Sequence, residues 1–292
     1  MKTGVIGLGA MGLGMANNLY KHGKLNAVWN RTSSKAEEYA KDKNITLASS
    51  PETLAAECNL IITCVSRDQD VLEMINAIAK GIREKAIVVD TSTVSSDTAM
   101  QAAEILNNKN AYFLDCPVSG GVEGAKRGSL AMMVGGDEPV LEQARETLSA
   151  IASNIAYIGP TGNGQACKAV NQLMAAGINQ AVTEALAFGQ AMNLDMEKVV
   201  DIVSTGAAGN WFLDHRGKSM LNDSFQPGFK LNLHFKDLKI CQTMADALSG
   251  NKLPVVEMTL LHYQRLINNG FGDEDISALF RLKKQLFQAS SQ

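Results

Sequence analysis

Short apolar segments alternate with amphipathic segments over the first 160 or so residues of the chain. Segments rich in β-branched and apolar residues lie at 3–7, 25–29, 60–65, 86–90, 111–115 and 130–136. Segments with helical periodicity lie between most of them, including 11–22, 34–42, 69–80 and 97–107. Two of the apolar runs, LIITCV and AIVVD, are apolar on both faces, as strands covered by helices on each side should be. The alternation predicts an α/β fold with a doubly wound parallel sheet.

The pattern changes at a turn-rich segment, GPTGNGQ, at 159–165. From Gln165 to about Met192 there is no proline, and apolar residues recur with helical spacing over a length well beyond the average helix. Later helical segments are broken at 206–209, 227–228, 250–254 and 270–272. We therefore expect a Rossmann domain at residues 1–161, and an all-helical domain at 162–292 that a long helix joins to it. A helix of that length buries more than one face, which favours a homo-oligomer, either a dimer or a tetramer.

Composition narrows the function classes. The chain has 292 residues, a net charge of −3 and 46% hydrophobic residues, so no basic field attracts nucleic acid or anionic membrane. No apolar run approaches a membrane span, and the N-terminal run is interrupted by glycines, unlike a signal peptide. The five cysteines favour a reducing cytoplasm over a disulfide framework. Their spacing does not indicate a metal site.

A glycine-rich loop directly after the first predicted strand indicates a nucleotide site. It reads Gly7, Leu8, Gly9, Ala10, Met11, Gly12 and opens a predicted helix. In a strand–turn–helix context, the first glycine makes the tight turn, the second lets a pyrophosphate approach, and the third lets helix and strand pack closely. N–H groups at the helix start would face the phosphates.

The stretch AVWNRTSSK, 27–35, lacks the acid that usually grips the adenosine ribose about 20 residues after the glycines. Asn30 removes the repulsion of a 2′-phosphate, and Arg31 offers a guanidinium fork suited to phosphate oxygens. Thr32 adds a hydroxyl and Lys35 a further cation. A solvated loop with an accidental arginine is the alternative, but the position favours NADP(H) over NAD(H).

The carboxyl ends of two later strands should border the nicotinamide half of the cofactor. Val65 and Ser66 follow one of these strands, and Ser92 and Thr93 follow the other. Polar caps of strand ends would produce the same sequence.

Ser119, Gly120 and Gly121 follow a further strand. Consecutive N–H groups in a glycine turn can form a nest for a carboxylate, whereas a flexible loop is the simpler interpretation.

Two further places carry a lysine beside polar side chains. Lys168 lies one turn into the long helix, with Asn171 and Gln172 on the same face. Lys236 and Asp237 lie in the motif LHFKDL. From spacing alone, a surface lysine and a surface ion pair explain these features equally well or better.

Taken together, these stretches resemble the β-hydroxyacid dehydrogenase family, which includes 3-hydroxyisobutyrate dehydrogenase. The resemblance runs from end to end and is carried by five motifs in order: GVIGLGAMGLGMANNL, DTSTVS, DCPVSGG, GNGQACKAVNQ and LHFKDL. It implies an NADPH-linked oxidoreductase acting on small hydroxy acids or their semialdehydes. Hydride would pass to an aldehyde or keto carbon.

The resemblance also implies roles for particular residues. Lys168 is the catalytic residue, which protonates the developing alkoxide in the reduction and acts as base in reverse. Ser119, Gly120 and Gly121 hold the substrate carboxylate. Further substrate-side residues implied are Asn171, Gln172, Phe229, Lys236 and Asp237, with Lys236 also reaching the cofactor.

Two branches of the family share features with the chain. VWNRT and GFGDEDISAL resemble the glyoxylate/succinic semialdehyde reductases, whereas the Asn171–Gln172 pair is similar to the tartronate semialdehyde reductases. Imine reductases share the architecture and the Asn-Arg-Thr signature, and Lys168 counts against them. A non-catalytic NADP-binding scaffold could lose Lys168 and the Ser-Gly-Gly loop without penalty, yet both are present.

Overall fold

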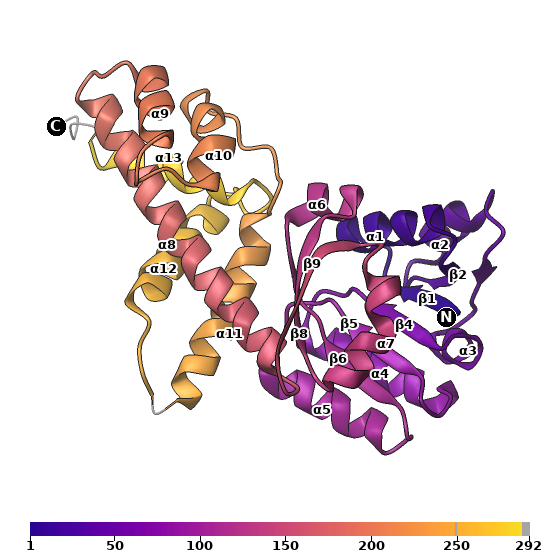
Figure 1. Cartoon of the computed structure of the whole chain (residues 1–292). Helices are drawn as coiled ribbons and strands as arrows, with labels where there is room; N and C mark the ends of the chain where they lie inside the picture. Colours follow the sequence, from indigo (N-terminus) through magenta and orange to yellow (C-terminus); the bar gives the residue numbers. More distant parts are fainter. Residues whose placement is uncertain (249, 288–292) are drawn as a thin grey trace. The chain divides into compact units, whose positions relative to one another are not determined.

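The computed structural model describes residues 1–248 and 250–287. The chain divides into two compact units, Met1–Lys168 and Ala169–Gln292 (Figure 1). Residues 249 and 288–292 of the expected second domain lie outside the described residues.

A sheet forms the centre of the first unit. Its strands among the described residues are β1 (Thr3–Ile6), β2 (Leu25–Trp29), β3 (Thr46–Leu47), β4 (Leu60–Thr63), β5 (Ile87–Asp90), β6 (Tyr112–Asp115), β7 (Val118–Ser119), β8 (Leu130–Gly135) and β9 (Ala152–Gly159). The spatial order is β3-β2-β1-β4-β5-β6-β8-β7, with β9 beside β8. Neighbouring strands from β3 to β6 are all parallel. This order confirms the expected α/β fold, because the chain reverses direction across the sheet after β3.

Helices cover both faces of this sheet (Figure 1). They are α1 (Ala10–Lys21), α2 (Ser33–Ala40), α3 (Pro51–Glu57), α4 (Asp68–Gly81), α5 (Ser96–Asn107), α6 (Gly121–Arg127) and α7 (Glu138–Leu148). Successive strand residues face opposite cores: Val5 belongs to the core that includes residues of α1, α2, α6 and α7, whereas Ile6 belongs to the core that includes residues of α3, α4 and α5. Burial on both faces explains why the central strands contain continuous apolar runs.

The expected parallel sheet is present from β3 to β6, whereas β8 pairs antiparallel with both β6 and β7. The chain turns back through Gly120, Gly121 and Gly128, all with positive φ, which glycine adopts without steric cost. The sequence pattern also missed three strands: β3 and β7 have only two residues each, and most of β9 is exposed or half-buried. Short or one-sided strands lack the apolar run that marks a buried strand.

The second unit is helical over its described residues. Its elements are the remainder of α8 (Asn163–Ala191), then α9 (Met196–Ser204), α10 (Trp211–Leu221), α11 (Leu231–Ala247), α12 (Pro254–Asn268), the 3₁₀ turn η1 (Ile276–Ala278) and α13 (Leu279–Gln285). The long helix and the breaks predicted at glycines and prolines are therefore confirmed. A separate core includes Phe280, Tyr263 and Leu238, all fully buried.

Candidate functional site

Of the three motif glycines in the glycine loop, Gly9 is the one beside open space. Gly7 has a φ of 97°, and its N–H donates to the carbonyl of Trp29 at 3.0 Å. A Cβ at Gly12 would overlap the Gly7 carbonyl, so helix α1 and strand β1 approach as closely as glycine allows. A Cβ at Gly9, in contrast, would meet no atom within 4 Å. Open space at Gly9, in front of the first N–H groups of α1, fits a pyrophosphate.

Asn30 holds this loop in place, a role that the sequence did not suggest. Its side-chain oxygen accepts the N–H of Leu8 at 2.8 Å, and its amide nitrogen donates to the Thr32 carbonyl at 2.9 Å. Ala10 and Met11 form the first turn of α1. Asn30 therefore couples the phosphate loop to the segment that would read the adenosine ribose.

A pocket of about 220 Å³ opens beside these residues. Predicted cofactor residues in its lining are Gly7, Gly9, Asn30, Arg31, Thr32, Val65 and Ser66, together with Lys35. Leu8, Ala10, Met11, Gly12 and Thr93 were predicted as well but do not line it. The predicted residues that do line it come from the carboxyl ends of β1, β2 and β4, the edge where α/β sheets bind nucleotides.

The Arg31 guanidinium contacts two acids on α4. Its Nη2 lies 2.6 Å from Asp70 Oδ1 and 3.6 Å from Glu73 Oε2. These carboxylates raise the pKa of Arg31. No sequence pattern predicted this pairing, because 39 residues separate Arg31 from Asp70.

Strand ends next to the pocket are tied together through Asp90 at the end of β5. Its Oδ1 accepts from the Thr63 hydroxyl at 2.6 Å and from the Ser92 hydroxyl at 2.7 Å. Ser92 Oγ in turn accepts the N–H of Val65 at 2.9 Å. Val65 and Ser92 therefore stabilise one shared strand edge, which agrees with the strand-cap interpretation of these residues.

The start of α8 is anchored on the sheet by Asp115, the last residue of β6. Its carboxylate accepts the N–H of Gly162 at 2.8 Å and of Gln165 at 2.9 Å. Burial raises the pKa of Asp115 to about 6. The Gln165 side chain accepts from Val94 N at 3.1 Å and donates to the Ser92 carbonyl at 2.9 Å. These bonds fix the first turn of the helix that carries Lys168.

Lys168 is 7% exposed, and its Nζ donates to the Val118 carbonyl at 2.8 Å. Val118 directly precedes Ser119 in β7, and Gly120 and Gly121 follow with φ of 125° and 61°. The structure therefore brings the predicted catalytic lysine against the strand that opens the predicted carboxylate loop. A buried ammonium beside a turn of consecutive N–H groups can protonate an oxygen of an anionic substrate.

In the second unit, Gln172 connects α8 to α11. Gln172 Nε2 donates to Asp237 Oδ2 at 2.6 Å, and Asn171 Nδ2 donates to Gln172 Oε1 at 2.8 Å. Lys236 Nζ lies 3.0 Å from Asp237 Oδ1. The surface ion pair that was the alternative explanation is excluded for Asp237, which is 4% exposed.

A buried network of hydrogen bonds leads from Asn179 through Tyr263 and His234 to Gln172. Asn179 Nδ2 donates to the Tyr263 hydroxyl at 2.9 Å, and His234 Nδ1 lies 3.0 Å from the same oxygen. His234 Nε2 lies 3.2 Å from the Gln172 carbonyl. If Tyr263 donates to Nδ1, the imidazole is neutral with its proton on Nε2, directed at Gln172. The sequence showed His234 and Tyr263 only as isolated residues and did not indicate that they share a hydrogen-bond network.

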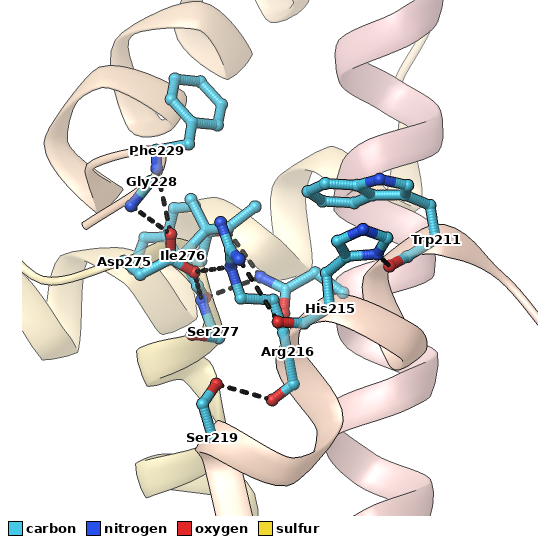
Figure 2. A network of polar contacts seen from close by, with 11 residues as sticks. Trp211, His215, Arg216, Ser219, Gly228, Phe229, Asp275, Ile276 and Ser277 are labelled. Atoms are coloured by element: carbon cyan, nitrogen blue, oxygen red, sulfur yellow. Dashed lines mark hydrogen bonds and ion pairs between the residues drawn. The ribbon is translucent and has the colours of Figure 1, made fainter. Parts of the chain in front are cut away.

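Phe229 lies in a loop that Asp275 holds (Figure 2). The Asp275 carboxylate accepts the N–H groups of Gly228 and Phe229 at 3.0 Å each and of Ser277 at 3.1 Å. Arg216 Nε lies 3.2 Å from the same carboxylate, which is 1% exposed. Asp275 thus determines the backbone path just before α11, the helix with Lys236 and Asp237.

Two negative findings concern the described residues alone. Within 1–248 and 250–287, no group of three or more His, Cys, Asp or Glu side chains is arranged to hold a metal ion. No helix in that part of the chain is both long and apolar enough to span a membrane.

The fold and the pocket are those of a dinucleotide-binding protein, and comparisons with known proteins show an oxidoreductase family. Residues 2–159 match the family model described as the NAD binding domain of 6-phosphogluconate dehydrogenase. Residues 162–283 match the one described as NAD-binding of NADP-dependent 3-hydroxyisobutyrate dehydrogenase.

Individual relatives cover nearly the whole chain. A probable 3-hydroxyisobutyrate dehydrogenase-like protein of Arabidopsis thaliana is 33% identical over 100% of this chain and 87% of its own length. The mitochondrial 3-hydroxyisobutyrate dehydrogenase of Mus musculus is 30% identical over 97% and 87%. The structure of Mycobacterium tuberculosis 3-hydroxyisobutyrate dehydrogenase with L-serine has a TM-score of 0.86 at 28% identity, covering 96% of this chain and 98% of that one. The chain belongs to the β-hydroxyacid dehydrogenase family, the family of 3-hydroxyisobutyrate dehydrogenase.

An imine reductase from Streptomyces aurantiacus also shares the fold, with a TM-score of 0.66 at 20% identity over 97% of this chain and 99% of that one. Identity at that level indicates common architecture alone.

Proposed function

We propose that this protein is an NADPH-dependent reductase of small carboxylate-bearing semialdehydes or keto acids, which are reduced to β- or γ-hydroxy acids. The observation that carries the proposal is the position of Lys168: buried, on an anchored helix turn, and bonded to the carbonyl that precedes Ser119. A lysine ammonium buried without a function would be costly, since desolvation disfavours its charged form.

In this mechanism each group acts on one part of the substrate. The N–H groups of Ser119, Gly120 and Gly121 bind the carboxylate and so orient the carbonyl. NADPH, when bound, supplies a hydride to the carbonyl carbon. Lys168 Nζ stabilises the developing negative charge on the oxygen and transfers a proton to it.

Residues of the second unit complete the proposal. Asn171 and Gln172 follow Lys168 by one turn on α8, and the short bond from Gln172 to Asp237 holds both amides in a defined rotamer. Lys236 is proposed to reach the cofactor and the substrate, and Phe229 to line the substrate pocket. Their support is the family membership together with the hydrogen-bonded framework described above.

The proposed cofactor is NADPH, because Arg31, Thr32 and Lys35 gather at one pocket where the usual ribose-binding acid is replaced by Asn30. Arg31→Ala should raise the KM for NADPH far more than the KM for NADH. An equal rise for both would overturn the phosphate assignment, because a lost 2′-phosphate contact cannot affect a nucleotide that lacks the phosphate.

The catalytic assignment is tested with Lys168→Ala. We expect turnover to disappear while NADPH binding, followed by fluorescence titration, stays nearly unchanged. Lys126→Ala is the matched control, since Lys126 lies on neighbouring α6 with a side chain 62% exposed, paired with Glu123. Normal turnover in Lys168→Ala would refute the mechanism.

The substrate is sought with an initial-rate panel of glyoxylate, succinic semialdehyde, tartronate semialdehyde and methylmalonate semialdehyde, each with NADPH and NADH. A cyclic imine belongs in the same panel. Reduction of the imine with no activity on the carboxylate-bearing carbonyls would favour the imine reductase alternative.

A homo-oligomer in the cytoplasm remains part of the proposal. Apolar side chains stand exposed along α8, among them Val170 at 60% and Met174 at 62%. Light scattering coupled to size-exclusion chromatography would distinguish monomer, dimer and tetramer.

A further inference from the structure

Arg31 has two acidic partners on α4. Its side chain is 62% exposed at the rim of the pocket, within ion-pair distance of Asp70 and Glu73. Asp70 is the less exposed of the two acids, with a side chain 19% exposed against 60% for Glu73. It lies in the first turn of α4 and lines the same pocket.

The charged side chains around Arg31 do not favour the binding of a phosphate. Two cations, Arg31 and Lys35, stand against two anions, Asp70 and Glu73, so the formal charge of the group is zero. A phosphate monoester carries nearly two negative charges at neutral pH. To bind it through both prongs of its fork, Arg31 has to release or share the nitrogen now 2.6 Å from Asp70 Oδ1.

We propose that Asp70 is a specificity-determining residue that competes with the 2′-phosphate for Arg31 and so limits the preference for NADPH over NADH. The inference rests on the proposed NADPH site. Asp70 also places a carboxylate in the lining of the pocket, although none follows β2 directly. Asp70 acts through Arg31, and Glu73, 1.0 Å farther from the guanidinium (3.6 against 2.6 Å), acts less.

Binding of nucleotide fragments tests this without any catalysis. Isothermal titration of the full chain with 2′,5′-ADP and with 5′-ADP isolates the contribution of the 2′-phosphate. Asp70→Asn should tighten 2′,5′-ADP about threefold to fivefold, the size expected of an exposed ion pair. Binding of 5′-ADP should stay within about twofold of wild type. The gain should shrink at high salt, because exposed charges are screened.

Two variants distinguish the effect of the Arg31–Asp70 ion pair from a general effect of net charge. Asp97→Asn makes the same change in net charge at an exposed position in the first turn of α5 and should leave both affinities unaltered. In an Arg31→Ala background, Asp70→Asn should lose its benefit. Thermal unfolding of each variant verifies that it folds.

Unchanged or weaker 2′,5′-ADP binding in Asp70→Asn would overturn the inference, since a weaker complex means that Asp70 orients Arg31 for the phosphate. A gain that persists without Arg31 would overturn it as well. Failure of the NADPH assignment looks different: wild type would bind 2′,5′-ADP no better than 5′-ADP, and Arg31→Ala alone would change neither.

Discussion

Gly164→Ala is expected to displace the helix that carries Lys168. Gly164 is the second residue of α8, pressed against the ends of two strands. A Cβ added there would lie 2.6 Å from the Met133 carbonyl oxygen and closer still to that of Asp115. Both are backbone atoms of the sheet, so neither can rotate away.

The size of the effect follows from these distances. The helix start has to retreat by about 1 Å to restore ordinary contact with the Asp115 carbonyl oxygen, and overpacking of this kind costs about 1–3 kcal/mol. The same shift stretches the bonds from Gly162 and Gln165 to Asp115, now 2.8 and 2.9 Å. Misplacing a catalytic group by about 1 Å can cost about 100-fold in rate, so we expect kcat to fall at least tenfold.

Gly177→Ala is the matched control, because it makes the same substitution in the same helix. A Cβ at Gly177 would meet only Val255, at 3.8 Å. Alanine is the better helix former, so this variant should gain up to about 1 kcal/mol. Urea unfolding gives the two stabilities, and initial rates with the best substrate of the panel give kcat. The reasoning is refuted if Gly164→Ala stays within about 0.5 kcal/mol of wild type, or if Gly177→Ala loses as much.

Three further outcomes are expected. Gly9→Ala should fold with unchanged stability, because its Cβ meets no protein atom, yet it should weaken nucleotide binding at least tenfold by titration; normal binding would remove the pyrophosphate from this loop. Burial raises the pKa of Asp115 from 3.8 to about 6, so the folded state holds this proton more tightly than the unfolded chain. Stability should then fall by about 3 kcal/mol, from a shift of roughly 2 pKa units, as pH rises from below about 4 to above about 6, and Asp115→Asn should lack that component in urea titrations at each pH. Tyr263→Phe removes the hydrogen-bond partner of Asn179 and His234 and should destabilise the second unit by about 1–3 kcal/mol. A change within experimental error would show that this hydrogen-bond network does not stabilise the fold.

Much of the first unit was predictable because its signals are local. The run LNAVW at 25–29 is β2 residue for residue, since a strand buried between helix layers needs a continuous apolar segment. The glycine loop was predictable as well, because a left-handed φ at Gly7 and close packing at Gly12 both require glycine. Such constraints act between residues that are close in the sequence, so they can be recognised from the residue types.

The edge of the sheet was not predictable in the same way. The segment 130–136 has the apolar character of a strand, yet periodicity is blind to direction, so the antiparallel pairing of β8 did not follow from it. Strand β9 was not predicted, because most of its side chains are exposed or half-buried. Direction and pairing depend on partners elsewhere in the chain.

The candidate site was likewise predictable only in part. By itself the sequence determined which chemical groups are available: a phosphate loop, an arginine where an acid is usual, a serine–glycine turn and Lys168 on a long helix. Only the tertiary structure decided their partners: Asp70 on Arg31, Asp115 under the start of α8, and the Val118 carbonyl on Lys168. These contacts join residues 39 to 50 positions apart, and a hydrogen bond depends on distance in space rather than along the chain.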